Sequence, residues 1–321
     1  NWWRSIDRKI FIFSTLLILI GCVISFAATP SIAIKYNLEE YHFVKKHLVF
    51  APITFFFISF TSLLSHIGIK RIFLFIFLIS IIFILYSFFL GIENKGSIRW
   101  VSFFGYSFQP SEFLKVSFIV ICAWIFSLKN KFQLMSKKLF TFILYLLVSS
   151  LILKQPDFSM FLIISIVYFG QLFISGLKWR WVLASGAFLT SISLAAYFIL
   201  DNVKRRIDIF INPQSGDNYQ ITKSIQAIEE GQLLGKGPGM GNIKDSLPDA
   251  HTDFIFSVIA EEFGLIISLL IITFFIYLIA NIYKRLRVEK EFFTILCVSG
   301  LVIQFSSQIL INIGSTIGLI P

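Results

Sequence analysis

Long apolar stretches separated by short polar loops dominate this 321-residue chain. A helix needs about 20 apolar residues to cross the hydrocarbon core of a bilayer. Nine stretches approach or exceed that length: 10–28, 48–66, 72–91, 112–128, 139–155, 158–176, 181–200, 253–282 and 292–319. The pattern predicts an all-α, polytopic integral membrane protein with nine spans in one transmembrane domain over 1–321.

Basic residues are concentrated in alternate short loops. Cytoplasmic loops of membrane proteins carry an excess of Lys and Arg. With the N-terminus in the cytoplasm, the inner side receives more than half of the 28 basic residues: Arg4, Arg8, Lys9, Lys70, Arg71, Lys129, Lys131, Lys137, Lys138, Lys178, Arg180, Lys284, Arg285, Arg287 and Lys290. The net charge of +10 is therefore mainly a topology signal and does not indicate a nucleic-acid partner. The 201–252 segment becomes a large loop on the outer side.

Composition supports the membrane assignment and excludes several other classes. Hydrophobic residues make up 56% of the chain and charged residues 14%, against about 25% charged in soluble domains. The three cysteines lie inside apolar stretches without metal-ligand spacing, so no metal site is predicted. There is no glycine-rich phosphate loop, which makes direct use of a nucleotide improbable. No internal repeat supports an inverted-repeat transporter.

Two outward-facing loops carry charged residues close to helix ends. In the first, Pro110 and Ser111 predict a helix start with Ser111 as the N-cap. Glu112 and Lys115 then lie three residues apart on one face of the first turn. An interfacial ion pair, with Trp100 among the membrane-interface aromatics, is the simpler alternative to a functional role. The second loop, Gln155-Pro-Asp157, is either functional or a polar turn.

The large outer loop contains three adjacent cations and a run of glycines. Lys204, Arg205 and Arg206 suit an anionic headgroup or pyrophosphate, and a solvated charged stretch is the alternative. The glycines of 231–241 allow sharp turns and close approach of a ligand to the backbone. They do not form a nucleotide site.

Residues 247–264 lead from a polar turn directly into an apolar segment. If Asp253 starts a helix, then Asp253, Ser257, Glu261 and Gly264 share one face, whereas Glu262 is rotated off it. Ionisable groups at membrane depth are costly and indicate a functional site by default. We therefore expect the stripe to line a cavity; polar contacts between helices are the alternative.

Together these segments resemble the SEDS family (shape, elongation, division and sporulation) of peptidoglycan polymerases, to which FtsW and RodA belong. The segments that carry the resemblance are Lys95-Gly-x-x-Arg99-Trp100, Gln109-Pro-Ser-Glu112 with Lys115, Gln155-Pro-Asp157, Tyr219-Gln220, Gly235-Lys-Gly-Pro-Gly239, His251-Thr-Asp253-Phe, Glu261-Glu-Phe-Gly264 and Asn312-Ile-Gly314…Gly318-Leu-Ile-Pro321. Gly237-Pro-Gly239 and the 247–251 segment look more like FtsW of alphaproteobacteria than RodA. Asp249 and Ser159 depart mildly from the family pattern. The family continues into a tenth span, so the chain is expected to be truncated before it.

The resemblance implies a glycosyltransferase that polymerises lipid II into β-1,4 glycan chains with inversion and releases undecaprenyl pyrophosphate. Asp253 matches the family's essential Asp and is the expected catalytic base. The expected cations for the substrate diphosphate are Lys95, Arg99, Lys115, Arg205 and Arg206, and Trp100 is expected to pack against lipid or sugar. The expected cavity-supporting residues are Glu112, Gln155, Asp157, His251, Ser257 and Glu261. A divalent cation such as Mg²⁺ or Mn²⁺ could share the charge of the diphosphate, although the sequence has no dedicated set of metal ligands.

The family also implies partners and a location. These are a class B penicillin-binding protein, which crosslinks the glycan, and divisome regulators in septal synthesis. The expected location is the bacterial inner membrane, with the N-terminus cytoplasmic and the active site periplasmic. Two alternatives remain at this point: a flippase or transporter for lipid II, and a non-catalytic divisome scaffold.

Overall fold

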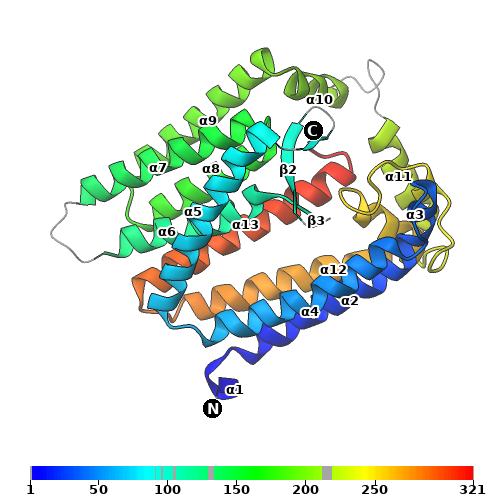
Figure 1. Ribbon diagram of the computed structural model, residues 1–321, viewed down its shortest axis with the longest axis horizontal. Helices are drawn as coiled ribbons and strands as arrows, with labels where there is room; N and C mark the ends of the chain where they lie inside the picture. Colours follow the sequence, from blue (N-terminus) through cyan, green and yellow to red (C-terminus); the bar gives the residue numbers. More distant parts are fainter. Residues whose placement is uncertain are drawn as a thin grey trace. The chain divides into compact units, whose positions relative to one another are not determined.

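Long helices account for most of the computed structural model, which describes residues 2–90, 92–94, 97–103, 106–128, 134–211 and 219–320 (Figure 1). Eight helices in these ranges are long and apolar enough to cross a membrane: α2 (Arg8–Ala28), α4 (His42–Leu63), α5 (His66–Leu90), α6 (Pro110–Ser127), α7 (Leu134–Lys154), α9 (Trp179–Ile199), α12 (Ile255–Leu286) and α13 (Phe292–Thr316). The remaining predicted span, 158–176, corresponds to α8 (Phe158–Ile174), an apolar helix of 17 residues. The all-α fold class is therefore confirmed.

The chain divides into two compact units, each built from separate parts of the sequence. Unit 1 comprises Asn1–Leu63, Leu200–Lys284 and Ile309–Pro321, and unit 2 comprises Leu64–Ile199 and Arg285–Gln308. Within α13, residues up to Gln308 therefore belong to unit 2 and the last turns to unit 1. The single domain over 1–321 stays a prediction.

In unit 1, α2 packs along α4 and α12 (Figure 1). Asp7 caps the start of α2 by accepting hydrogen bonds from the backbone N–H groups of Lys9 and Ile10, which would otherwise have no partner within the helix. Phe13 of α2 contacts Phe274 and Tyr277 of α12, both with ring centroids 4.7 Å apart. Aromatic contacts of this kind hold helices together where both faces are apolar.

A smaller apolar cluster of unit 1 lies at the C-terminal end of α2. It joins that end and α3 (Pro30–Lys35) to the turn before α12 and to the first turn of α12. Its buried members are Ala28, Ile32, Leu247, Ala250, Phe254 and Val258. This cluster anchors the 247–254 turn to the C-terminal end of α2 and to α3.

In unit 2, α6 lies at the centre and packs against α5, α7 and α8. Its core includes two tyrosines, Tyr145 and Tyr168, whose rings stack with centroids 4.6 Å apart. The Tyr145 hydroxyl lies 2.8 Å from Ser165 Oγ, so this buried polar group has a partner. The Gln171 side-chain amide donates to the carbonyls of Ile119 and Leu296, which ties α8 to α6 and α13.

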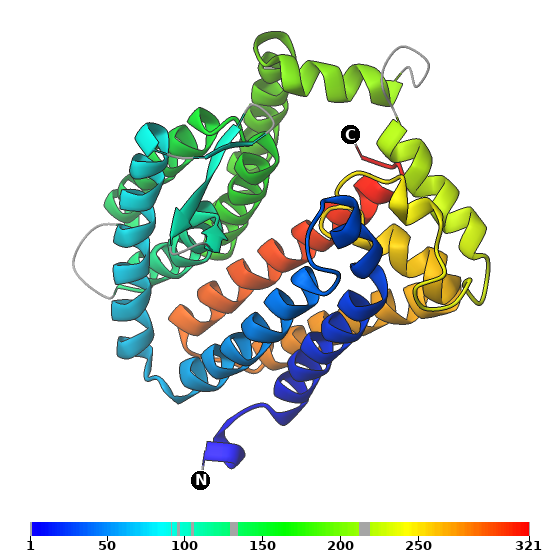
Figure 2. The same cartoon turned by 45° about the vertical axis from the view of Figure 1, so that its right-hand side comes forward.

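Two of the longer loops contain secondary structure that the apolar pattern did not predict. Between α5 and α6, strands β1 (Ile92–Asn94), β2 (Ser97–Phe103) and β3 (Tyr106–Phe108) form an antiparallel sheet in the order β1-β2-β3. The 201–252 loop contains α10 (Asp201–Ile211), α11 (Tyr219–Gly231) and a 3₁₀ turn, η1 (Ile243–Asp245). Figure 2 shows the yellow segment after α11 folded against the first turns of α12.

Candidate functional site

The proposed base, Asp253, lies in a turn and not in a helix. Residues 248–254 form turns and α12 begins at Ile255, so the expectation that Asp253 starts the helix is wrong. Asp249, with a φ of 55°, bends the chain, and its carbonyl accepts from the backbone N–H of Thr252 at 3.0 Å. The side chain of Asp253 is exposed, whereas its neighbour Phe254 is buried in the small cluster of unit 1. The turn is therefore anchored by apolar residues and presents a carboxylate.

The helix that follows, α12, is interrupted at Gly264, which has a φ of 81° and a ψ of 173°. The break releases backbone groups that would otherwise bond within the helix, and the glycine-rich loop (residues 231–241) supplies their partners. Four backbone hydrogen bonds join the two segments: Lys236 N to Glu261 O at 2.9 Å, Gly237 N to Glu262 O at 2.9 Å, Leu265 N to Gln232 O at 2.9 Å and Ile266 N to Leu233 O at 3.3 Å. The glycine-rich loop is thus part of the packed interior of unit 1 and does not form a free flap.

Two glycines permit this contact. A Cβ on Gly264 would lie 2.4 Å from the backbone N of Gly235, and one on Gly235 would lie 2.3 Å from the carbonyl oxygen of Glu262. Both also have a left-handed backbone conformation that other residues rarely adopt.

The two adjacent glutamates are buried within unit 1 on the N-terminal side of this break. Glu261 and Glu262 are 0% and 1% exposed. The part of α12 after Gly264 is by itself long enough, at about 1.5 Å per residue, to cross a hydrocarbon core of about 30 Å. Within unit 1, both glutamates are buried against the glycine-rich loop and η1. Their location at membrane depth stays a prediction.

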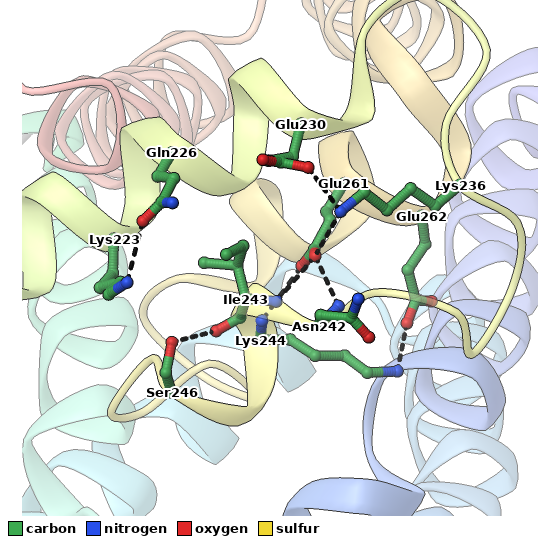
Figure 3. Close-up of polar contacts among 10 residues, drawn as sticks. All are labelled: Lys223, Gln226, Glu230, Lys236, Asn242, Ile243, Lys244, Ser246, Glu261 and Glu262. Carbon is green, nitrogen blue, oxygen red and sulfur yellow. Dashed lines mark hydrogen bonds and ion pairs between the residues drawn. The ribbon is translucent and has the colours of Figure 1, made fainter.

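Figure 3 shows the polar contacts of these carboxylates. Glu261 accepts from three successive backbone N–H groups, those of Asn242 at 2.7 Å, Ile243 at 2.8 Å and Lys244 at 3.0 Å. Glu262 pairs with the ammonium of Lys244, which is itself 2% exposed. Both glutamates therefore contact the same segment, although successive residues of a helix point in different directions around its axis.

A second, exposed ion pair lies beside this cluster. Lys236 Nζ is 2.7 Å from the carboxylate of Glu230 and 3.9 Å from that of Glu261. The hydrogen bond from Lys236 lowers the pKa of the Glu230 carboxyl, and the same bond raises the pKa of Lys236. Figure 3 shows Lys236 between the two carboxylates.

Ser257 and His251, both expected to support a cavity, contact other parts of unit 1. The hydroxyl of Ser257 bonds to that of Ser224 on α11, and Ser224 donates to the carbonyl of Thr316 at the end of α13 at 2.6 Å. The ring of His251 packs on Phe43 with centroids 4.4 Å apart. Both residues therefore connect the Asp253 region to neighbouring elements.

In unit 2, Arg99 on β2 binds the turn between α7 and α8. Its guanidinium lies 3.1 Å from the Asp157 carboxylate and donates to the carbonyls of Gln155 at 3.1 Å and Pro156 at 2.6 Å. Asp157 also caps α8 by accepting from Met160 N at 3.1 Å. The buried Gln155 side chain donates to Ser87 Oγ at 3.2 Å. The predicted motif residues Arg99, Gln155 and Asp157 are thus brought together, with Arg99 bonded to protein groups.

The predicted pair at the start of α6 is also present. Lys115 Nζ lies 2.8 Å from the Glu112 carboxylate and 3.2 Å from Gln308 Oε1, and Lys115 is 1% exposed. The N-cap of α6 is Gln109, and Ser111 instead lies within the first turn, so that detail of the prediction is wrong. Because Pro110 occupies the first helical position, its missing N–H costs nothing there.

The remaining predicted contact residues lie at the surface or outside the described part of the chain. Trp100 is 37% exposed on β2. Arg205 and Arg206 are exposed on α10 in unit 1. Lys95 lies outside the described residues. Among those described, no group of three or more His, Cys, Asp or Glu side chains could hold a metal ion.

Sequence reasoning missed Lys244 and Gln308 and left Glu262 unassigned. Lys244 is a single cation in a loop, and its partner is 18 residues further along the chain. The one available signal was the Glu-Glu pair, because two carboxylates in an apolar stretch require buried partners.

Comparison with known proteins gives the family. Residues 7–321 match the family model for FtsW, RodA and SpoVE, described as "Cell cycle protein". This chain belongs to the FtsW/RodA/SpoVE family. The predicted SEDS resemblance is thereby confirmed, and the chain is a multi-pass membrane protein.

Curated members of the FtsW/RodA/SpoVE family cover the chain almost completely. A relative from Caulobacter vibrioides (strain NA1000 / CB15N), named "Probable peptidoglycan glycosyltransferase FtsW", is 34% identical over 322 residues, which covers 100% of this chain and 82% of that protein. A relative of the same name from Borreliella burgdorferi (strain ATCC 35210 / DSM 4680 / CIP 102532 / B31) is also 34% identical, over 85% of this chain and 78% of its own length. The predicted likeness to FtsW is confirmed by these relatives.

Solved structures share the fold. A chain described under "Structural coordination of polymerization and crosslinking by a peptidoglycan synthase complex" has a TM-score of 0.76 at 19% identity, covering 99% of this chain and 89% of that one. The rod shape determining protein RodA of Thermus thermophilus has a TM-score of 0.63 at 20% identity, covering 97% and 85%. At these identities the likeness concerns the fold of the FtsW/RodA/SpoVE family.

Proposed function

We propose that the chain is a peptidoglycan glycosyltransferase that polymerises lipid II at the outer face of the inner membrane, in septal wall synthesis. The observation that carries the proposal is Asp253, an exposed carboxylate on a turn that the buried residues Leu247, Ala250 and Phe254 anchor. Family membership and the names of the curated relatives support the reaction class.

The reaction needs a base, and Asp253 is our choice. The 4-hydroxyl oxygen of the acceptor GlcNAc attacks the anomeric carbon of the donor MurNAc. The bond from that carbon to the diphosphate oxygen breaks, undecaprenyl pyrophosphate leaves with the electron pair, and the anomeric centre is inverted. Asp253 accepts the hydroxyl proton. General-base assistance of this kind typically contributes about 10²- to 10⁴-fold in rate.

The departing diphosphate needs positive charge, and the predicted cations differ in availability. Arg205 and Arg206 are exposed on α10 and are our first candidates for the diphosphate. Arg99 and Lys115 already bind carboxylates and carbonyl or amide oxygens, so a substrate would have to replace those partners. Lys95 and the packing role of Trp100 remain part of the proposal. To test whether Mg²⁺ or Mn²⁺ contributes, the polymerisation rate is measured at increasing concentrations of each metal ion.

The proposal includes a topology and partners. The basic loops support a cytoplasmic N-terminus and a periplasmic Asp253. We propose a class B penicillin-binding protein as the crosslinking partner, because a glycan polymer requires a transpeptidase to become a wall. Divisome regulators follow from a septal role.

Polymerisation of lipid II by the purified full chain in detergent tests the function. Glycan chains longer than a dimer, with or without the added penicillin-binding protein, are the expected product. Transport has no meaning in detergent and a scaffold makes no polymer. The absence of chains under both conditions would therefore contradict the proposal and favour the flippase or the scaffold.

A further inference from the structure

Three buried charges of unit 1 have no role in the proposed reaction: Glu261, Glu262 and Lys244. Each is at most 2% exposed. Burying a charge costs free energy unless it is paired and hydrogen-bonded. Apolar residues would fill the same space without that cost, so the charges call for a specific explanation. Glu261 and Glu262 both bind residues 242–244.

These contacts hold residues 242–244 from two sides. On one side, Glu261 accepts the three successive backbone N–H groups and Glu262 pairs with the Lys244 ammonium. On the other side, Lys244 Nζ donates to the carbonyl of Ala27 at 3.3 Å. Ala27 lies in the last turn of α2, where helical carbonyls have no partner within the helix and a cation is favourable. In addition, Lys35 of α3 donates to the carbonyl of Asp245 at 2.7 Å.

The segment held in this way leads directly into the Asp253 turn. Leu247 and Ala250, which follow it, are 3% and 0% exposed in the small cluster of unit 1. The turn is followed by α12, and the first turns of α12 carry Glu261 and Glu262. Both ends of the Asp253 turn are therefore fixed to the first turns of α12. The C-terminal end continues directly into this helix, and the N-terminal end follows residues 242–244, which Glu261 and Glu262 of the same helix bind.

We propose that Lys244, Glu262 and Glu261 are positioning residues for the reacting carboxylate of Asp253. This inference rests on the proposed function. Reacting groups have to be placed closely, and a displacement of about 1 Å can cost on the order of 10²-fold in rate. Loss of the buried Lys244–Glu262 pair leaves residues 242–244 held by Glu261 and Lys35, and the turn by its apolar residues. The turn then retains its place in the fold but loses the alignment of its carboxylate.

The chain offers a control pair of the same kind in unit 1, Lys45 and Glu39, with side-chain exposures of 66% and 72%. The two double variants, Lys244→Met with Glu262→Gln and Lys45→Met with Glu39→Gln, remove the same chemical groups. Each double variant removes both partners of its pair, so neither partner is left as an unpaired charge. Glu261→Gln provides a further variant of conservative shape if the buried double variant fails to fold.

The experiment measures kcat and KM for lipid II, the apparent melting temperature in detergent and amide hydrogen exchange of residues 246–254. For the buried double variant we expect a melting temperature close to that of the parent, kcat reduced by about tenfold to 10²-fold at nearly constant KM, and faster exchange in 246–254. The exposed double variant is expected to match the parent in all three.

Two outcomes separate this inference from the proposed function. A buried double variant with parental kcat and parental exchange would overturn the positioning role. If the parent itself makes no polymer, the proposed function fails, while the exchange measurement still decides whether the buried pair fixes the turn.

Discussion

The two units use charged motif residues in opposite ways. In unit 2, Arg99 on β2 pairs with Asp157 before α8, and Lys115 pairs with Glu112 within α6. In unit 1, the buried Glu261 binds backbone N–H groups and Asp253 stays exposed. The Arg99–Asp157 pair fixes where β2 meets the start of α8. A carboxylate that accepts hydrogen bonds from successive backbone N–H groups, as Glu261 does, fixes the path of a loop. The type of a charged motif residue therefore does not indicate which of these tasks it performs.

The largest effect is expected at the break in α12, on which the arrangement of unit 1 depends. Gly264→Ala adds a Cβ 2.4 Å from backbone atoms at a φ of 81°, so we expect a loss of about 3 kcal/mol or more and failure to yield folded protein. Gly186→Ala is the control, because nothing lies within 4 Å of its added Cβ. Size-exclusion yield and melting temperature measure both, and a stable Gly264→Ala protein would contradict the break.

The next effect tests the pairing in unit 2. Arg99→Met removes three donors from the 155–157 turn and leaves the largely buried Asp157 without its cation. We expect a destabilisation of about 1–3 kcal/mol. In the double variant with Asp157→Asn, part of this loss is recovered. A melting temperature that is unchanged in Arg99→Met would show that the contacts to the turn contribute nothing.

Removal of the Lys115 cation is expected to cost less than removal of Arg99, because its partner Glu112 is more exposed than Asp157. Glu112 has a side-chain exposure of 45%, so water can solvate it when the cation is removed. Lys115→Met replaces a buried ammonium with an apolar chain of similar shape, and we expect a change of about 1 kcal/mol or less in stability. The melting temperatures of Lys115→Met and Arg99→Met should therefore differ clearly. Equal losses would mean that exposure of the remaining carboxylate has no influence.

The smallest effect concerns Lys236 and Glu230 and depends on pH. The Glu230 pKa is lowered by Lys236, so its contribution to stability is present above its unfolded pKa of about 4.3 and is lost as the pH falls through the lower folded value. The Lys236 pKa is raised, so its contribution is lost only as the pH rises above about 10.4. Glu230→Gln and the parent should differ slightly in melting temperature at pH 7 and converge in acid. A difference that grows on acidification would contradict this sign.

The long helices could be predicted because uninterrupted apolar stretches have few alternatives in a bilayer. The pair Glu112 and Lys115 could also be predicted, since residues three apart share a helix face. The break at Gly264 could not, because a glycine inside an apolar stretch is compatible with a continuous helix. The partners of Glu261 and Glu262 depend on how the glycine-rich loop folds back, which no local pattern specifies. The resemblance singled out Arg99, Gln155 and Asp157 with separate roles, and the contact of Arg99 with the 155–157 turn required the structure.

The central claim is that the exposed carboxylate of Asp253 takes the proton in glycan polymerisation. Its most direct measurement compares purified parent, Asp253→Asn and Asp245→Asn for glycan chains formed from lipid II in detergent. Asp245 is an exposed aspartate on η1 in the segment that leads to the same turn, so it controls for loss of a nearby negative charge. We predict that Asp253→Asn keeps the parental melting temperature and loses about 10²-fold or more of the rate, while Asp245→Asn polymerises like the parent. Glycan synthesis by Asp253→Asn at the parental rate would contradict the assignment of this residue as the base.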